Sequence, residues 1–168
     1  MIGAEDLRHA LGHFTTGVTV VTTTSADGEP VGTTASAVSA LSLDPPLVLV
    51  CLARSSETLS EIAAQRRFAV NVLSDAQREL SDNFARRGDG AVWSDVVHRL
   101  DGDGLGNPRL DGALAVLDCE LAESVSGGDH EIVVGRIHGL EVGAGELRPL
   151  LHFRGAYAAL ADDAVQGR

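Results

Sequence analysis

The sequence predicts a mainly β fold, an antiparallel barrel with a few short helices. Three observations support this prediction. β-Branched or alternating segments recur along the chain, turn-forming residues separate them, and only three short stretches have helical periodicity. The 168 residues correspond to about one average domain, and neither a linker nor a repeat divides them. We therefore expect residues 1–168 to form a single domain whose strands close into a barrel.

The N-terminal part of the chain supplies the first helix and strands. Leu7, Leu11 and Phe14 recur at helical spacing, and the residues around Val20 are β-branched. The expected elements are, in order, a helix at Ala4–Phe14, a strand at Val18–Thr24, a hairpin turn at Ser25–Pro30, a strand at Val31–Ala40, a break at Leu41–Pro46 and a buried strand at Leu47–Ala53.

The remaining elements follow from two capping motifs and from alternation. Thr58 with Glu61, and Ser74 with Gln77, match the capping box that opens a helix. The segment Gly88–Pro108 is rich in Gly and Asp, so we expect an irregular excursion there. The further strands expected are Arg67–Leu73, Ala113–Val125, Glu131–Val142 and one or two within Leu150–Leu160, with Ser126–His130 as a connection.

The composition argues against several classes of protein. Asp and Glu number 24 against 13 Lys and Arg, and the net charge of −11 disfavours nucleic-acid and membrane-surface binding. All 13 basic residues are arginine, so a phosphate-loop lysine or a pyridoxal Schiff base has no candidate. Cys51 and Cys119 lie in apolar segments, where we expect buried thiols and no metal site. No apolar run is long enough to span a bilayer and no targeting segment is evident, so we expect a cytoplasmic protein.

Two segments have the composition of a ligand site. Gly32–Val48 begins with a strand of small residues, which either lets a flat ligand approach the backbone or allows a tight strand contact inside a small barrel. Arg54–Thr58 places an arginine and three hydroxyl side chains just before a helix. Such a segment either binds an anion or simply caps the helix.

These segments, with several others, resemble the flavin reductase-like family, the small split-barrel reductases that serve two-component monooxygenases. The similarity spans roughly Leu7 to Leu160. Family members often carry Ser-Phe where this chain has Ser36-Ala37, so one ring-packing contact differs. The motifs in the family's order are Phe14–Val21, Thr34–Val48, Arg54–Thr58, Phe68–Leu73, Ser81–Ala85, Gly128–His130 and His152–Tyr157.

The resemblance implies an FMN-binding split barrel, a homodimer, and an NAD(P)H-dependent reductase that supplies reduced FMN or FAD to a partner monooxygenase. Hydride transfer from NADH or NADPH to a flavin needs no protein nucleophile, which fits a sequence without an obvious catalytic constellation. By the same resemblance His130 acts on the nicotinamide side. The implied cofactor-binding residues are Thr33, Thr34, Ala35, Ser36, Ala37, Ser39, Ala40, Leu41, Ala53, Arg54, Ser55, Ser56, Thr58, Asn83, Phe84, His152, Arg154 and Gly155.

Two alternative functions stay open at this point. One is a flavin-binding module that stores or hands over flavin without turnover. The other is a split-barrel oxidase that keeps its flavin permanently bound.

Overall fold

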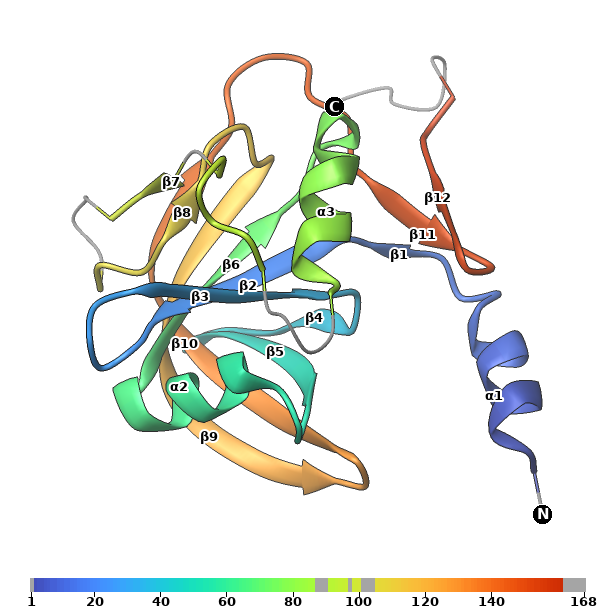
Figure 1. Cartoon of the computed structure of the whole chain (residues 1–168), viewed down its shortest axis with the longest axis horizontal. Helices are drawn as coiled ribbons and strands as arrows, with labels where there is room; N and C mark the ends of the chain where they lie inside the picture. The colour runs from blue at the N-terminus through green and yellow to red at the C-terminus, as the bar shows by residue number, and fades with distance from the viewer. Residues whose placement is uncertain (1, 87–90, 97, 101–104, 162–168) are drawn as a thin grey trace.

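A seven-stranded antiparallel sheet, strongly curled, forms the body of the protein (Figure 1). The computed structural model describes residues 2–86, 91–96, 98–100 and 105–161. Neighbouring strands in the sheet follow the order β3-β2-β6-β9-β10-β5-β4. Their bounds are β2 (Thr19–Thr24), β3 (Pro30–Ala35), β4 (Val38–Leu43), β5 (Pro46–Ala53), β6 (Arg67–Val72), β9 (Ala115–Gly127) and β10 (His130–Val142).

The barrel is split because its two edge strands, β3 and β4, are not hydrogen-bonded to each other within the described part of the chain. The single strand expected at Val31–Ala40 is therefore interrupted at Ser36–Ala37, where the chain passes from one edge to the other. The backbone N–H of Cys51 donates to the carbonyl of Ala37 at 2.9 Å and holds this crossing against β5. The expectation of closure was wrong; the mainly β, antiparallel split barrel is confirmed.

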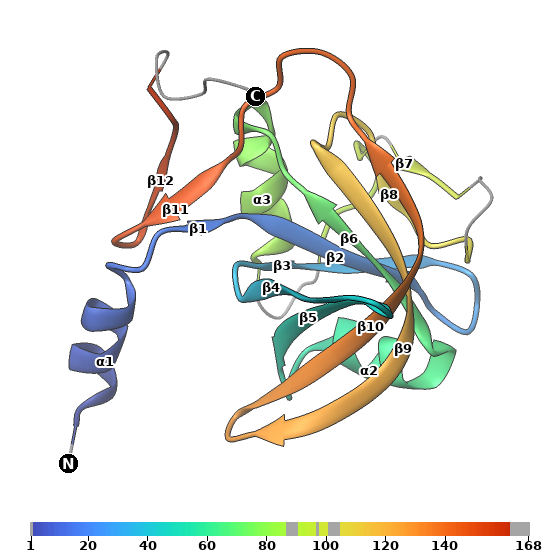
Figure 2. The ribbon, with the colours of Figure 1, turned by 180° about the vertical axis from the view of Figure 1, so that it is seen from behind.

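Smaller elements surround the sheet. Helix α1 stands away from the sheets and buries none of its residues (Figure 2). A three-stranded sheet of order β1-β11-β12 lies between α1 and α3, and β7 pairs with β8. The bounds are α1 (Ala4–Leu11), α2 (Glu57–Gln65), a 3₁₀ turn (Asp75–Gln77), α3 (Arg78–Phe84), β1 (Thr16–Gly17), β7 (His98–Arg99), β8 (Arg109–Leu110), β11 (Leu151–Phe153) and β12 (Ala156–Ala158).

The main core lies inside the curled sheet, with Phe68 near its centre and Ile62 of α2 packed into it. Both side chains are fully buried. Gly135 of β10 faces Phe68, and a Cβ at that position would overlap the phenyl ring and crowd Cys119. A glycine here lets a large aromatic side chain fill the barrel, which is what close packing requires.

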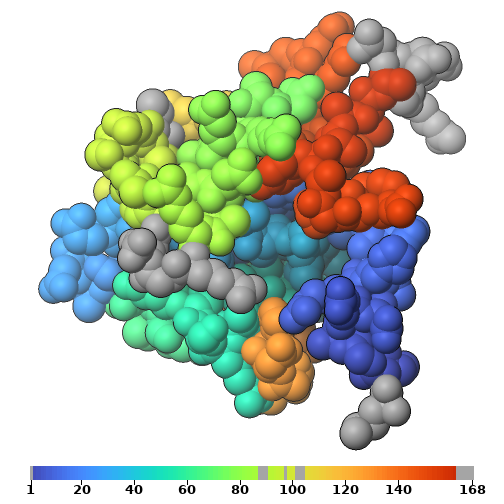
Figure 3. Space-filling view, turned by 45° about the vertical axis from the view of Figure 1, so that its right-hand side comes forward, coloured from blue at the N-terminus to red at the C-terminus, as the bar shows by residue number. Residues whose placement is uncertain are grey.

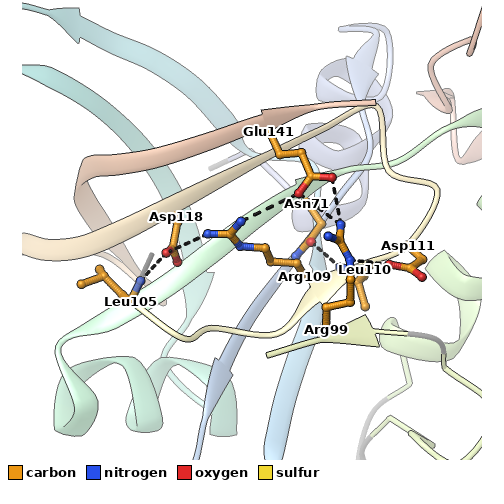
Figure 4. A network of polar contacts seen from close by, with 8 residues as sticks. All are labelled: Asn71, Arg99, Leu105, Arg109, Leu110, Asp111, Asp118 and Glu141. Carbon is orange, nitrogen blue, oxygen red and sulfur yellow. Dashed lines mark hydrogen bonds and ion pairs between the residues drawn. The ribbon is translucent and has the colours of Figure 1, made fainter. Parts of the chain in front are cut away.

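Asp118 of β9 anchors the irregular segment 105–110 (Figure 4). Its carboxylate, 1% exposed, accepts hydrogen bonds from the backbone of Leu105, from Asn107 Nδ2 at 2.7 Å and from Arg109 at 3.4 Å. Buried Asn71 continues the network, because its Oδ1 accepts from the backbone N–H of Leu110 at 2.9 Å. This irregular segment is therefore fixed to the sheet through buried polar contacts rather than through an extended ladder.

Several element predictions need correction. Helix α1 ends at Leu11 rather than Phe14, since Gly12 caps it. β4 extends through Leu43, because the turn before β5 needs only Asp44–Pro45. Ser56, not Thr58, caps α2: its hydroxyl oxygen accepts from the backbone of Leu59.

One capping motif is confirmed, and one burial prediction is corrected. Ser74 and Gln77 form the predicted capping box. Cys51 is half-buried rather than buried, since alternation along β5 turns it away from the core face that holds Val50 and Leu52. Within Gly88–Pro108, residues 88–90, 97 and 101–104 lie outside the described residues, and the rest contributes the short strand β7.

Candidate flavin site

The end of β5 meets the start of β10. Ala53 lies directly opposite His130 in the register, so their side chains leave the same face of the sheet. One residue further, the backbone N–H of Arg54 donates to the carbonyl of Asp129 at 3.0 Å. In Figure 3 the tip of the β9–β10 hairpin (orange) lies against the teal segment that leads into α2. The end of β5 and the start of β10, 77 positions apart in sequence, thus form one surface. The contact between Arg54 and Glu131 shows the same proximity.

Arg54 and the beginning of α2 supply the positive features of this surface. The guanidinium side chain is half exposed, at 50%, and its Nε donates to Glu131 Oε1 at 3.1 Å. Ser56 follows two residues later and caps α2, a helix whose N-terminal end carries a partial positive charge. The two groups lie two residues apart in sequence and could hold a phosphate together.

Glu131 is itself held by three donors. Besides Arg54, the hydroxyls of Ser126 and Ser124 donate to its carboxylate at 2.9 and 3.2 Å. These contacts, the bond from Ser126 foremost, lower the pKa of Glu131 below its ordinary value. The carboxylate therefore stays ionised beside Arg54 at neutral pH.

His130 pairs with its own neighbour in the turn. Its Nδ1 lies 2.8 Å from Asp129 Oδ1, and this hydrogen bond is the main reason that the pKa of Asp129 is lowered. The imidazole is 46% exposed. The contact orients the ring and leaves its Nε2 atom directed away from Asp129, available to a ligand.

A pocket of about 290 Å³ opens at the split between the two edges of the barrel. The hydroxyl oxygen of Thr16 is buried here, and no hydrogen-bond partner for it exists among the described residues. His152 of β11 lies opposite Thr16 in the register. The pocket lining consists of Phe14, Thr15, Thr16, Gly17, Thr19, Ser36 and Val38.

These features fit a flavin in three respects. The crossing at Ser36–Ala37 exposes backbone between small side chains, which suits a flat ring. The orphan hydroxyl of Thr16 can bond a polar ring edge. Arg54 and the start of α2 can receive a phosphate.

Two of the predicted residues on α3 serve the fold in this structure. The side-chain amide of Asn83 donates to the carbonyl of Val92 at 2.8 Å and accepts from the Val92 N–H at 3.1 Å. Phe84, 2% exposed, packs against Trp93 with ring centroids 4.8 Å apart. Thr34 of β3 donates to the carbonyl of Ser81 at 2.7 Å, so it faces α3 rather than Arg54.

The remaining predicted residues fall into three places. Arg154 and Gly155 form the turn between β11 and β12, both with positive φ, and the Arg154 N–H donates to the carbonyl of Gly12 at 2.7 Å. Thr58 is 2% exposed on α2 and cannot present its side chain to solvent. The others lie along the edge strands or before α2: Thr33 and Ala35 on β3, Ser39, Ala40 and Leu41 on β4, and Ser55 in the turn after β5.

Three residues of this surface were missed by sequence reasoning. Glu131 and Asp129 flank His130, and their charge beside a predicted nicotinamide-side histidine was the available signal. Thr16 lies before the expected strand Val18–Thr24 and inside the motif Phe14–Val21, but its residue type alone did not mark it as a site residue.

Comparisons with known proteins show the family of the chain. A family model described as a flavin reductase-like domain matches residues 11–161. The chain is 41% identical over 162 residues to the flavin-dependent monooxygenase reductase subunit HsaB of Mycobacterium tuberculosis, covering 95% of this chain and 83% of that one. It is 42% identical over 151 residues to a probable flavin reductase of Rhizobium meliloti, covering 90% of this chain but only 47% of that one.

Solved structures give the same result. Nitrilotriacetate monooxygenase component B from Mycobacterium thermoresistibile superposes with a TM-score of 0.90 at 39% identity, covering 98% of this chain and 90% of that one. An NADH:FAD oxidoreductase of Streptomyces globisporus, in complex with NAD and FAD fragments, superposes with a TM-score of 0.88 at 33% identity, covering 98% and 99%.

The fold and the named relatives together define an oxidoreductase of the split-barrel class. The chain belongs to the flavin reductase-like family. Within its described residues, no helix is long and apolar enough to cross a membrane. The same residues contain no group of three or more His, Cys, Asp or Glu side chains placed to hold a metal ion.

Proposed function

We propose that the protein is an NAD(P)H-dependent flavin reductase that delivers reduced FMN or FAD to a partner monooxygenase. The observation that carries the proposal is the meeting of Arg54, the start of α2 and His130 at one end of the β5–β10 pair. Its relatives named as monooxygenase reductase subunits support the partner. The predicted cytoplasmic location belongs to the same proposal.

The protein's own contribution is to bind and orient. A flavin held there would supply the redox chemistry. Arg54 and the N-terminal end of α2 hold the phosphate, and the small residues Ala37 and Ser39 let the ring lie close to the backbone. His130, oriented by Asp129, contacts the nicotinamide nucleotide on the same face as Ala53. Close, ordered stacking of the two rings is the main catalytic requirement.

A second copy of the chain completes the site in this proposal. The pocket at the split, about 290 Å³, is at the lower limit for pockets that enclose whole ligands, so it covers only part of a flavin. Leu7 and Leu11 of α1 and nearby Phe14 are 49%, 63% and 77% exposed. Such an apolar helix face beside an incomplete pocket suits a homodimer in which α1 covers the partner.

The test is oxidation of NADH or NADPH by the purified protein, with and without added FMN, FAD or riboflavin. Flavin-dependent consumption of the nicotinamide nucleotide supports the reductase. Binding of flavin without consumption would indicate a storage module. Yellow colour that persists through desalting, with turnover that needs no added flavin, would indicate an oxidase with retained flavin.

A further inference from the structure

The guanidinium group proposed to read the flavin phosphate already has an anionic partner in this chain. Arg54 Nε donates to Glu131 Oε1 at 3.1 Å. Glu131 is less exposed than Arg54, with 21% of its side chain accessible against 50%. The carboxylate, not the guanidinium, is the fixed member of the pair, because two serine hydroxyls also hold it.

Further negative charge lies close by. Asp129 lies in the turn that faces Arg54, and Glu57 occupies the first turn of α2. Arg54 is thus paired with Glu131 and lies beside the turn that carries Asp129, which is paired in turn with His130. A phosphate that approaches Arg54 therefore enters a region without net positive charge.

We propose that Glu131 competes with the flavin phosphate for Arg54, and so keeps flavin an exchangeable substrate rather than a permanently bound group. The inference rests on the proposed function, in which Arg54 binds that phosphate. It makes Glu131 a positioning residue that sets affinity through Arg54.

When a phosphate binds Arg54, the Glu131 carboxylate can either stay in place or move aside, and it opposes phosphate binding in both cases. If the carboxylate stays in place, it repels a phosphate that binds the same guanidinium. If it moves aside, it gives up its hydrogen bonds from Ser124 and Ser126. Both outcomes weaken FMN binding and speed its release, whereas riboflavin, which has no phosphate, experiences neither.

The decisive variant is Glu131→Gln. Glutamine keeps the shape but removes the charge. Its amide oxygen can accept from Ser126 and Arg54, which share Oε1, while its NH2 group takes the place of Oε2 and can donate to the Ser124 hydroxyl oxygen. Because exposed ion pairs are individually weak, we expect FMN to bind roughly two- to fivefold tighter and to dissociate correspondingly more slowly. Riboflavin affinity should stay unchanged. Fluorescence titration gives both dissociation constants, and stopped-flow displacement gives the release rate.

Glu123→Gln is the matched control. Glu123 lies on the same β9–β10 hairpin and is exposed, and within the described part of the chain its side chain makes no hydrogen bond or ion pair. The variant should leave FMN affinity as it is. The effect of Glu131→Gln should also shrink in an Arg54→Ala background, because the two residues act through one contact.

Three results would overturn the inference: an unchanged FMN affinity in Glu131→Gln, an equal gain for riboflavin, or an equal gain in Glu123→Gln. These binding measurements need no nicotinamide nucleotide. A protein that binds FMN but never oxidises NADH or NADPH would disprove the reductase, while the competition at Arg54 would still be decided.

Discussion

His130 and Ala53 lie directly opposite each other on β10 and β5, although 77 positions separate them in the sequence. The pairing brings the residue expected to contact the nicotinamide to the strand end that leads into Arg54. In the proposed function, both nucleotides therefore bind at this one end of the β5–β10 pair, as direct hydride transfer between two stacked rings requires.

Arg54→Ala should weaken FMN binding and leave riboflavin binding nearly unchanged. Because the guanidinium is half exposed and shared with Glu131, we expect a loss of roughly three- to tenfold, below that of a buried charged contact. Arg136→Ala, which removes an exposed arginine from the middle of β10, is the control. Equal losses for FMN and riboflavin in Arg54→Ala would mean that Arg54 supports the fold and does not bind the phosphate.

His130→Ala should raise the KM for NADH more than the KM for flavin, by roughly three- to tenfold if one hydrogen bond is lost. His138→Ala is a close match, since His138 is also exposed on β10 and bonded to a carboxylate, Glu120, at 3.0 Å. Steady-state kinetics with each substrate varied separately gives the two constants. Two unchanged KM values would make His130 an ordinary surface residue.

Leu7→Ser combined with Leu11→Ser should convert the proposed dimer to a monomer and reduce flavin affinity, because both side chains are exposed on α1. Leu100→Ser removes a similarly exposed leucine, 48%, outside α1 and serves as the control. Light scattering measures the mass of each variant. A fully active wild-type monomer would contradict the proposal.

Asp118→Ala should lower the free energy of unfolding by about 2–4 kcal/mol, because buried Asn107 and the Leu105 N–H lose their acceptor. The measurement is urea unfolding followed by circular dichroism. Glu123→Ala, an exposed position on the same strand, should change the midpoint little. Equal shifts in the two variants would mean that the network of Figure 4 contributes nothing measurable.

Cys119 should resist thiol reagents in the native state. Burial raises the pKa of its thiol to about 12, so roughly one molecule in ten thousand carries the thiolate at pH 8. Half-buried Cys51 should react first. A native protein that releases one equivalent of chromophore from a disulfide reagent, and two after denaturation, fits this expectation; two equivalents at once would contradict it.

The sequence was a good guide to the strands and a poor guide to what joins them. Alternation and β-branching located β5, β6, β9 and β10 to within a few residues, because those side chains divide between core and surface. The interruption at Ser36–Ala37 could not be predicted, since small residues suit a continuous strand equally well.

The site was predictable only where its contacts are local. Arg54 and the start of α2 are adjacent in sequence, so their proximity was assured. The Arg54–Glu131 pair depends on the register of β5 against β10, which no local pattern specifies. The same is true of Thr16 opposite His152.

Gly32 leaves room for two aromatic side chains over the edge strand β3. It lies on β3 beneath Phe84 and Trp93, and a Cβ there would approach the Phe84 ring to 2.9 Å. Trp93 is the protein's single tryptophan. Its indole therefore sits within reach of the edge strand that lines the split, while Asn83 holds the neighbouring backbone in place. Trp93 is therefore an intrinsic fluorophore at a known place. Changes in its emission during a flavin titration can be assigned to one side of the barrel without attaching any label.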